Sequence, residues 1–234
     1  MEERTRIFVD MDGVLAEFRA IDTLERLYEK GYFLNLSPVY NVIDAVKLLN
    51  KDPKFEVFIL SAVLTDSKYA LNEKNAWLDH YLPEIDQEHR VFPPCGESKR
   101  NHIPGGVRNS DCLLDDYTKN LLEWEPPAHG VKLINGINHT HKTWKGSIVY
   151  GVPWQEVTTI KTNYGIMPVK KYRDLAARQR GFADYKDMYE KGYRLGNQYD
   201  MPEHNEPDAV QLYNAIVGQI AKRKMGIDNS GRKL

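Results

Sequence analysis

Cysteine is scarce in this 234-residue chain, which contains only Cys95 and Cys112. Two cysteines at this spacing form neither a disulfide framework nor a Cys-x-x-Cys metal or redox motif. No apolar run approaches the length that crosses a membrane. The first strand is expected within the first ten residues, where a signal peptide would otherwise lie. We therefore expect a protein of the reducing cytoplasm with no membrane partner.

A charge excess of either sign is also absent. The chain has 32 lysines and arginines against 33 aspartates and glutamates, which gives a formal net charge of −1. Nucleic-acid-binding domains usually carry a basic excess or a basic patch, so no nucleic-acid partner is expected. Repeats and low-complexity tracts are missing too. With 41% hydrophobic residues, the chain is suited to one domain with a sizeable core, with room for an appendage.

What the chain does contain is a short apolar stretch that ends in two carboxylates. Residues 7–9 read Ile-Phe-Val, which is typical of a buried strand, and Asp10, Asp12 and Gly13 follow. Ligands of open α/β sheets bind beyond the carboxyl ends of the strands. Side chains at i and i+2 of an extended segment point the same way, so this pair needs a cation or a shared proton. Mg²⁺ fits because it prefers oxygen ligands; a solvated Asp-Gly turn is the alternative.

Strands and helices are predicted to alternate along the first two thirds of the chain. The further strands are expected at residues 55–60, 90–92, 111–114 and 131–134, and the helices at 42–49, 68–81 and 117–124. This βαβ spacing favours a parallel sheet covered by helices on both faces. Apolar residues at helical spacing predict a short helical insert at residues 16–30, and residues 154–160 are predicted to close the core as a helical turn.

From about residue 163 the composition becomes strongly charged, with apolar residues again at helical spacing. A last helix is predicted at about residues 207–222, with a proline at its first position. We therefore predict a core domain over residues 1–162 and a helical C-terminal extension over residues 163–234. The extension is expected to pack on the core or on a second subunit of a homodimer; a nucleic-acid or regulatory partner is the less favoured alternative.

Polar residues follow several of the predicted strands. Asp10 and Asp12 follow the first strand, Ser61 the second, and Asp115 with Asp116 a later one, while Lys99 lies in the loop between. The order Asp-x-Asp, Ser, Lys, Asp-Asp, with the hexapeptide DMDGVL at residues 10–15, resembles the four motifs of the haloacid dehalogenase superfamily of phosphotransferases.

This resemblance implies a role for each residue. Asp10 would be the nucleophile that forms an aspartyl-phosphate, and Asp12 the general acid and then the general base. Ser61 would bind the phosphate oxygens and Lys99 would neutralise their charge. Mg²⁺ would be held by carboxylates and one carbonyl oxygen, supplied by Asp10, Asp12, Asp115 and Asp116.

Four segments are similar to successive blocks of the 5′(3′)-deoxyribonucleotidase family, namely GYFLNLSP at residues 31–38, VFILS at 57–61, KNAWL at 74–78 and LLDD at 113–116. The similarity covers roughly residues 5–160 and leaves out the tail. It implies a Rossmann-like three-layer core, Mg²⁺-dependent hydrolysis of nucleoside monophosphates, often deoxyribonucleotides, and a small helical cap at about residues 16–40. Tyr32 and Phe33 belong to an aromatic block that would lie near the base; core packing is the alternative.

The chain departs from the family's pattern in three places. Its second motif reads Leu-Ser-Ala where the family usually has Thr-Ser-Pro; Ser61 and Ala62 remain the expected phosphate-binding residues. The segment after Lys99 is longer than usual, so Arg100 or Lys119 is an alternative to Lys99. The cap is short, which leaves the base and the sugar of the substrate open.

Three functions are consistent with these sequence features. The leading one is a Mg²⁺-dependent 5′-nucleotidase, and the others are a phosphatase for another small phosphorylated metabolite and a non-catalytic regulatory or binding protein on the same fold. The Asp10 and Asp12 pair argues against the last, because a non-catalytic site needs no general acid. His139 and His141 suggest a transition metal, but no third ligand has matching spacing, so a surface role is expected.

Overall fold

The structure is a computed structural model that describes residues 3–18, 21–135, 137–138, 142–152, 159–195 and 208–226. The chain divides into two compact units, residues 1–151 with 208–234 and residues 152–207. The predicted division at residue 162 therefore differs from the observed one, because the last helix belongs to the first unit. His139 and His141 lie outside the described residues.

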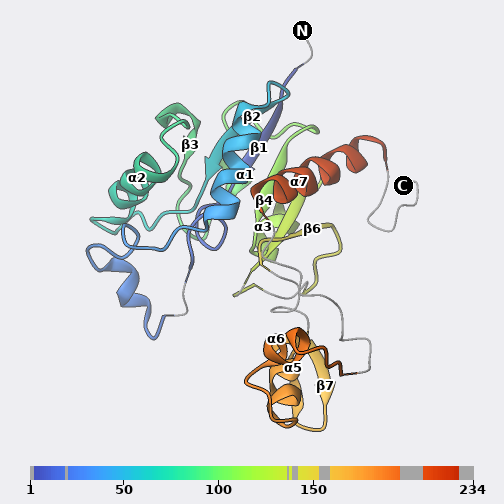
Figure 1. The fold of residues 1–234 in the computed structure, drawn as a ribbon. Coiled ribbons are helices and arrows are strands. Elements are labelled where there is room, and N and C mark those ends of the chain that lie inside the picture. Colours follow the sequence, from blue (N-terminus) through green and yellow to red (C-terminus); the bar gives the residue numbers. More distant parts are fainter. Residues whose placement is uncertain are drawn as a thin grey trace. The chain divides into compact units, whose positions relative to one another are not determined.

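The first unit is built around a six-stranded parallel sheet in the order β3-β2-β1-β4-β5-β6 (Figure 1). Its strands are β1 (Thr5–Val9), β2 (Phe55–Leu60), β3 (Arg90–Val91), β4 (Cys112–Asp115), β5 (His129–Ile134) and β6 (Ser147–Tyr150). Strands inside a parallel sheet are covered on both faces, which explains the unbroken apolar runs of β1 and β4. The predicted α/β parallel sheet is confirmed.

Helices cover both faces of this sheet. They are α1 (Tyr40–Lys51), α2 (Ala70–Tyr81), α3 (Thr118–Trp124) and α7 (Ala209–Lys224). Ile7 and Val9 of β1 point to one face and pack in a core with α1, α2 and α7. Phe8, between them, points to the other face and packs with Trp124 of α3. This is the three-layer, Rossmann-like arrangement that the resemblance implied.

Helix α7 lies beside α1 although more than a hundred residues separate them (Figure 1). Leu212, Ile216 and Ile220 of α7 are buried in the same core as the apolar face of α1. The predicted last helix is thus confirmed, and its surroundings are those of a core element.

One predicted helical segment is wrong, and a second is described only at its last two residues. In residues 16–18 and 21–30 the only helix is a 3₁₀ turn, η1 (Leu24–Tyr28), and Leu24 is 71% exposed. Short helices are marginal in water without extensive burial, and no residue of η1 is buried, although Leu27 packs partly against the core. Of the predicted turn at residues 154–160, residues 153–158 lie outside the described part, and Thr159 and Ile160 lie in a strand.

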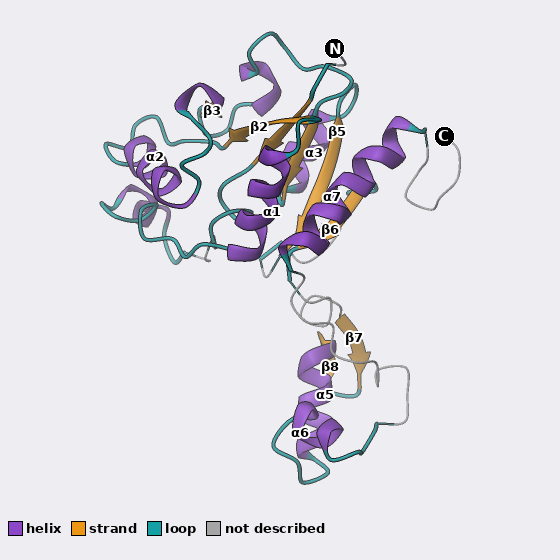
Figure 2. Ribbon diagram, turned by 45° about the horizontal axis from the view of Figure 1, so that its top comes forward, coloured by secondary structure: helices purple, strands orange, loops and turns teal. Residues whose placement is uncertain are grey.

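The described part of the second unit contains a hairpin and two helices, shown in Figure 2. Strands β7 (Thr159–Thr162) and β8 (Gly165–Pro168) pair antiparallel, and α5 (Val169–Arg178) and α6 (Tyr185–Glu190) follow. Ala177, Tyr185 and Met188 form a small core of this unit. None of the helices described in either unit is long and apolar enough to cross a membrane.

Candidate active site

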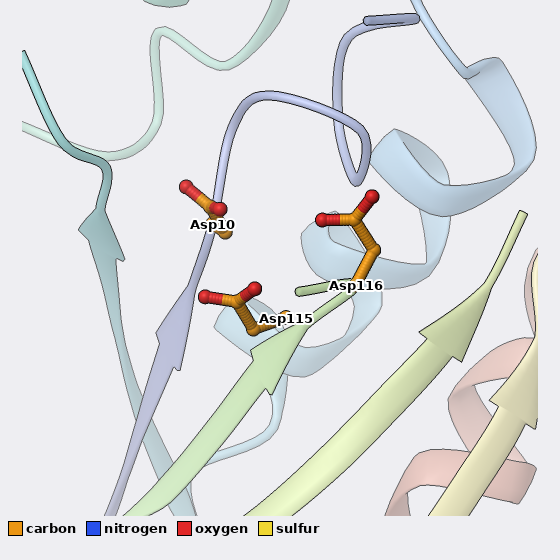
Figure 3. Close-up of side chains that lie close together, drawn as sticks. All are labelled: Asp10, Asp115 and Asp116. Carbon is orange, nitrogen blue, oxygen red and sulfur yellow. The ribbon is translucent and has the colours of Figure 1, made fainter. Parts of the chain in front are cut away.

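Three aspartates meet at the carboxyl ends of β1 and β4 (Figure 3). Asp10 directly follows β1, Asp115 ends β4, and Asp116 comes next. The backbone amide of Asp10 donates to the carbonyl of Leu114 at 3.0 Å, which holds the two strand ends side by side. One oxygen from each carboxylate lies within 4.8 Å of the others, and all three side chains are buried. The structure thus brings together three of the residues predicted to bind Mg²⁺.

Gly13 makes room for the third carboxylate. Its φ is +81°, and a Cβ at this position would lie 2.3 Å from Oδ2 of Asp116. Any other residue would therefore be strained and would also collide with Asp116. Asn135, directly after β5, donates through Nδ2 both to the carbonyl of Gly13 and to Oδ2 of Asp116, the latter at 2.8 Å.

Asn138 adds a second amide to the same oxygen, at 2.8 Å from Nδ2 to Oδ2 of Asp116. Sequence reasoning missed both asparagines. Asn135 carries the signal that the aspartates also carried, a polar side chain directly after an apolar strand. The pair fixes the orientation of Asp116 and ties it to the turn after Asp10 and Asp12.

Lys99 lies between two of the carboxylates. Its Nζ is 2.9 Å from Oδ2 of Asp10 and 2.7 Å from Oδ2 of Asp115, and its side chain is buried. Burial opposes the charge of Lys99, but the two carboxylates outweigh it and raise the pKa of the ammonium above its ordinary value. The two predicted alternatives to Lys99 are engaged with Glu123 of α3. Arg100 donates to the carbonyl of Glu123, and Lys119, which is itself on α3, pairs with the Glu123 carboxylate at 3.6 Å.

A second buried lysine, Lys74, contacts Asp12. Sequence reasoning did not assign it to the site. Nζ of Lys74 donates to Oδ2 of Asp12 at 2.6 Å, to Oγ of Ser61 at 3.0 Å and to the carbonyl of Ala62 at 2.7 Å. Lys74 is on α2 and is fully buried. One ammonium group therefore joins the general-acid candidate to the two residues predicted to bind phosphate.

One carboxylate oxygen of Asp12 contacts Lys74, and the other does not form a hydrogen bond with any described residue. Its Oδ1 is buried and has no hydrogen-bond partner among the described residues. Burial raises the pKa of Asp12, Lys74 opposes the rise, and Asp10 adds to it. A carboxyl group with a raised pKa and one uncommitted oxygen is suited to carry a proton.

The two aromatic residues predicted to line the pocket have different surroundings. Phe33 is 4% exposed and belongs to the main core, with Nζ of Lys74 4.8 Å from the centre of its ring. Tyr32 packs edge-on against Phe33 at 5.0 Å, and its hydroxyl is buried without a hydrogen-bond partner in the described part of the chain. Burial and then the charge of Asp12 raise the pKa of Tyr32, which indicates that its hydroxyl lies toward the site. Of the two, Tyr32 retains a free polar group for a ligand.

The segment that carries these aromatics is held by a buried carboxylate next to Lys74. Glu73 accepts hydrogen bonds from the backbone amides of Gly31 at 2.5 Å and Phe33 at 3.1 Å. Neighbouring residues of α2 thus hold two parts of the site, because Glu73 fixes the aromatic segment and Lys74 contacts Asp12.

The donor set is suited to a hard divalent cation. Burial raises the pKa of Asp115, and burial and then Asp115 raise the pKa of Asp116 to about 7. Three carboxylates this close and this well buried repel one another when ionised, and a cation relieves that repulsion. Oxygen is the only ligand element that they offer, which fits Mg²⁺.

Comparison with known proteins identifies a family and several relatives that are similar to this chain. The family described as 5′ nucleotidase, deoxy (Pyrimidine), cytosolic type C protein matches residues 19–161. The chain is 28% identical over 120 residues to the human cytosolic-type 5′(3′)-deoxyribonucleotidase, a similarity that covers 35% of this chain and 60% of the relative. It is 33% identical over 102 residues to a putative 5′(3′)-deoxyribonucleotidase of Staphylococcus epidermidis, covering 44% of this chain and 50% of the relative. The chain thus spans about half of the length of the curated relatives it matches.

Proposed function

We propose that this chain, which belongs to the 5′ nucleotidase, deoxy (pyrimidine), cytosolic type C protein family, hydrolyses nucleoside monophosphates, with deoxyribonucleotides as its preferred substrates. The observation that carries the proposal is the cluster at the carboxyl ends of β1, β2 and β4. It brings together candidates for a nucleophile, a proton carrier, phosphate-binding donors and a cation site, which are the parts that phosphoryl transfer requires. The printed names of the relatives support the nucleotide substrate.

Asp10 is the proposed nucleophile. Its Oδ1 accepts a hydrogen bond from the amide of Met11 at 2.8 Å, and its Oδ2 is 2.9 Å from Nζ of Lys99. These contacts fix the plane of the carboxylate, which is what an in-line attack on phosphorus needs. The attack gives an aspartyl-phosphate and releases the nucleoside oxygen.

Asp12 is the proposed general acid. Its proton goes to the departing ester oxygen, and the resulting carboxylate then activates the water that hydrolyses the aspartyl-phosphate. Lys74 stabilises the carboxylate form through the contact of 2.6 Å. Lys74 donates its three N–H groups to Asp12, Ser61 and the carbonyl of Ala62, so in this proposal it offers the phosphate its positive charge, and Ser61 offers its O–H.

Mg²⁺ is the proposed cofactor, with Asp10, the carbonyl oxygen of Asp12, Asp115 and Asp116 as its ligands. When bound, it would neutralise the negative charge that gathers on the phosphoryl group. The asparagines at positions 135 and 138 keep Asp116 oriented for this role. We also propose a cytoplasmic location, which agrees with the cytosolic type of the human relative and with two free cysteines.

A second candidate is a phosphatase for another small phosphomonoester. It is favoured by the cap segment, whose only helix in the described residues is the exposed turn η1. A panel of nucleoside monophosphates and sugar phosphates, assayed with and without Mg²⁺, separates the two candidates. We expect nucleotides to be the best substrates and excess chelator to abolish turnover until Mg²⁺ is restored; full activity in chelator would contradict the cofactor assignment.

Two substitutions test the roles of the aspartates. We expect Asp10→Asn to be inactive toward every substrate because its amide cannot attack phosphorus. Asp12→Asn should spare part of the first step only for an activated ester such as nitrophenyl phosphate, whose leaving group needs no proton. General acid–base help is typically worth about 10²–10⁴-fold, so the contrast should be visible in single turnovers.

The intermediate gives the second readout of this experiment. In Asp12→Asn the aspartyl-phosphate formed from nitrophenyl phosphate should accumulate, because its hydrolysis needs the missing base, and acid quenching should trap it. Normal turnover by Asp10→Asn would show that another group is the nucleophile. Equal slowing of both substrates by Asp12→Asn, with no trapped intermediate, would exclude the proposed proton transfer.

A further inference from the structure

One acidic side chain of α2 anchors residues 31–36, the aromatic loop that carries Tyr32 and Phe33. Glu73 is only 8% exposed. Its carboxylate accepts hydrogen bonds from three backbone amides of the loop, those of Gly31 at 2.5 Å, Phe33 at 3.1 Å and Leu34 at 3.4 Å. Hydrogen bonds to an ionised acceptor are about twice as strong as neutral ones. Glu73 therefore holds the first half of the aromatic loop firmly against α2.

A left-handed turn at Gly31 helps to aim these amides at one carboxylate. Its φ is +88°, a conformation that favours glycine. The Gly31 carbonyl accepts hydrogen bonds from the amide of Asn35 at 3.0 Å and from Nδ2 of Asn35 at 2.7 Å, which closes the turn. Further along, Nε1 of Trp77 donates to the carbonyl of Leu36 at 2.9 Å. Because Glu73 and Trp77 are four residues apart on one helix, the loop is attached to the same side of α2 at both of its ends.

The same helix also contacts the phosphate side of the site, through the next residue. Nζ of Lys74 donates to Oδ2 of Asp12 at 2.6 Å and lies 4.8 Å from the centre of the Phe33 ring. Consecutive residues of α2 thus fix the aromatic loop and the general-acid candidate. Loss of the Glu73 contact would let the loop shift relative to Asp12 while Lys74 keeps its own contacts with the phosphate side.

Tyr32 is the residue of the aromatic loop that has a polar atom to offer a ligand. Its hydroxyl is buried and has no hydrogen-bond partner in the described part of the chain. Burial and then the charge of Asp12 raise the pKa of Tyr32, so the hydroxyl is on the side of Asp12. A buried O–H group without a partner is costly, and a ligand atom that accepts its hydrogen bond removes that cost. The Tyr32 hydroxyl is therefore placed to contact a substrate close to the ester oxygen that Asp12 protonates.

We propose that Glu73 is a positioning residue that selects the leaving group of the substrate. By holding the aromatic loop on α2, it keeps the Tyr32 hydroxyl where it can donate to an oxygen on the carbon next to the ester carbon. A nucleoside 5′-phosphate has such an oxygen in its sugar ring, whereas the nitrophenyl group has none. A site with an O–H group to satisfy discriminates against leaving groups that lack the acceptor. This inference rests on the proposed function and deepens it by naming what recognises the leaving group.

Kinetics and product inhibition of the full-length chain with thymidine monophosphate, a nucleotide of the class in the family's name, test the inference. Glu73→Gln keeps the size of the side chain but directs an NH₂ group at backbone donors. We expect KM to rise about tenfold or more with little change in kcat, and inhibition by thymidine to weaken by the same factor. Inhibition by inorganic phosphate should stay within about twofold, because phosphate contacts no part of the aromatic loop. Glu84→Gln, which changes an exposed residue just after α2, is the matched control and should behave as the unchanged chain.

Tyr32→Phe gives a second test that does not depend on how well Glu73→Gln folds. It removes only the hydroxyl, so inhibition by thymidine should weaken about threefold to tenfold, while KM for nitrophenyl phosphate should not change. The double variant Glu73→Gln/Tyr32→Phe should be no weaker than Glu73→Gln alone, because a displaced hydroxyl has no contact left to lose. Circular dichroism and thermal melting of each variant show that the folded state is retained.

Three outcomes would overturn the inference and leave the proposed function intact. They are equal weakening of inhibition by thymidine and by phosphate in Glu73→Gln, unchanged inhibition by thymidine in Tyr32→Phe, and additive losses in the double variant. A preference of the unchanged chain for a sugar phosphate would instead contradict the nucleotide substrate; Glu73→Gln should then weaken inhibition by the free sugar, and an unchanged value would overturn the inference as well. Absence of hydrolysis of every phosphomonoester would contradict both.

Discussion

Lys74 shows how much one side chain can contribute to this site. Its ammonium contacts Asp12, Ser61 and the carbonyl of Ala62, and it lies 4.8 Å from the centre of the Phe33 ring. A buried lysine is costly unless its charge is paired, so its position next to Asp12 is stabilised by that carboxylate. We infer that Lys74 both supplies positive charge to the phosphate site and sets the proton affinity of Asp12.

Replacing Lys74 with methionine tests this inference, because methionine nearly keeps the volume and removes the charge. We expect kcat/KM for a nucleotide to fall about 10²–10³-fold, as when one preorganised donor is lost. Because Lys74 lowers the pKa of Asp12, the pH limb of kcat that belongs to Asp12 should shift to higher pH. The exposed Lys68→Met is the matched control, and an equal loss in that control or an unchanged pH profile would contradict the inference.

Asp116 makes the stability of the metal-free protein depend on pH. Its pKa in the folded protein is raised to about 7 by burial and by Asp115, whereas an unfolded aspartate has a pKa near 4. The stability that comes from keeping Asp116 protonated is fully present below about pH 4, and it is lost as the pH rises through about 7. Ionised Asp116 is also the form that binds a cation.

We therefore expect the melting temperature in chelator to fall between pH 5 and pH 7.5 and Mg²⁺ to restore it at pH 7.5. For a chain of this size each kcal/mol corresponds to about 2–4 °C, so the change is measurable by thermal melting. Asp116→Asn should flatten the pH dependence and remove the stabilisation by Mg²⁺. A melting temperature in chelator that does not change with pH would show that Asp116 titrates normally.

At the scale of elements, the strands and their polar ends could be predicted from the sequence. The apolar runs of β1, β2 and β4 are buried on both faces and give a clear signal. Because parallel strands end at the same edge, the order Asp10, Ser61 and Asp115 was enough to predict one site. Strand β6 (Ser147–Tyr150) was missed because it is an edge strand that is only partly buried, so it lacks the fully buried apolar run that marks β4.

The elements that could not be predicted depend on what surrounds them. Helical spacing at residues 16–30 matches that of many true helices, but Leu24 has no core to cover and stays exposed. Helix α7 was placed in an extension because local pattern cannot show that Ile216 packs against α1. Lys74 had a signal that was overlooked, namely a lysine on the same helical face as Ala70 and Trp77, a face that is otherwise buried.

At the scale of the whole molecule, the chain leaves its main fold after β6 and returns to it as α7. The hydrophobic clusters among the described residues each draw on one unit only. The clusters on the two faces of the sheet use residues of the first unit, and the cluster of Ala177, Tyr185 and Met188 uses the second. Each unit therefore has its own core, and residues 152–207 form an insertion into the first unit.

This organisation predicts opposite results for two deletions, of which the shorter should do more harm. Joining residue 151 to residue 208 through a flexible glycine-serine linker should leave the melting temperature of the first unit within a few degrees and its phosphatase activity intact, because no core residue is lost. Ending the chain at residue 207 keeps the insertion but removes α7 and uncovers the side chains that pack against it. The buried Leu212, Ile216 and Ile220 each contribute about 1.5–3 kcal/mol.

Their sum, about 5–9 kcal/mol, is comparable with the whole stability of a typical domain, so the truncated chain should aggregate or stay unfolded. Thermal melting and assay of nitrophenyl phosphate hydrolysis separate the two variants. If the variant that lacks residues 152–207 fails to fold, the insertion stabilises the first unit. If the variant that ends at residue 207 folds normally, α7 is dispensable.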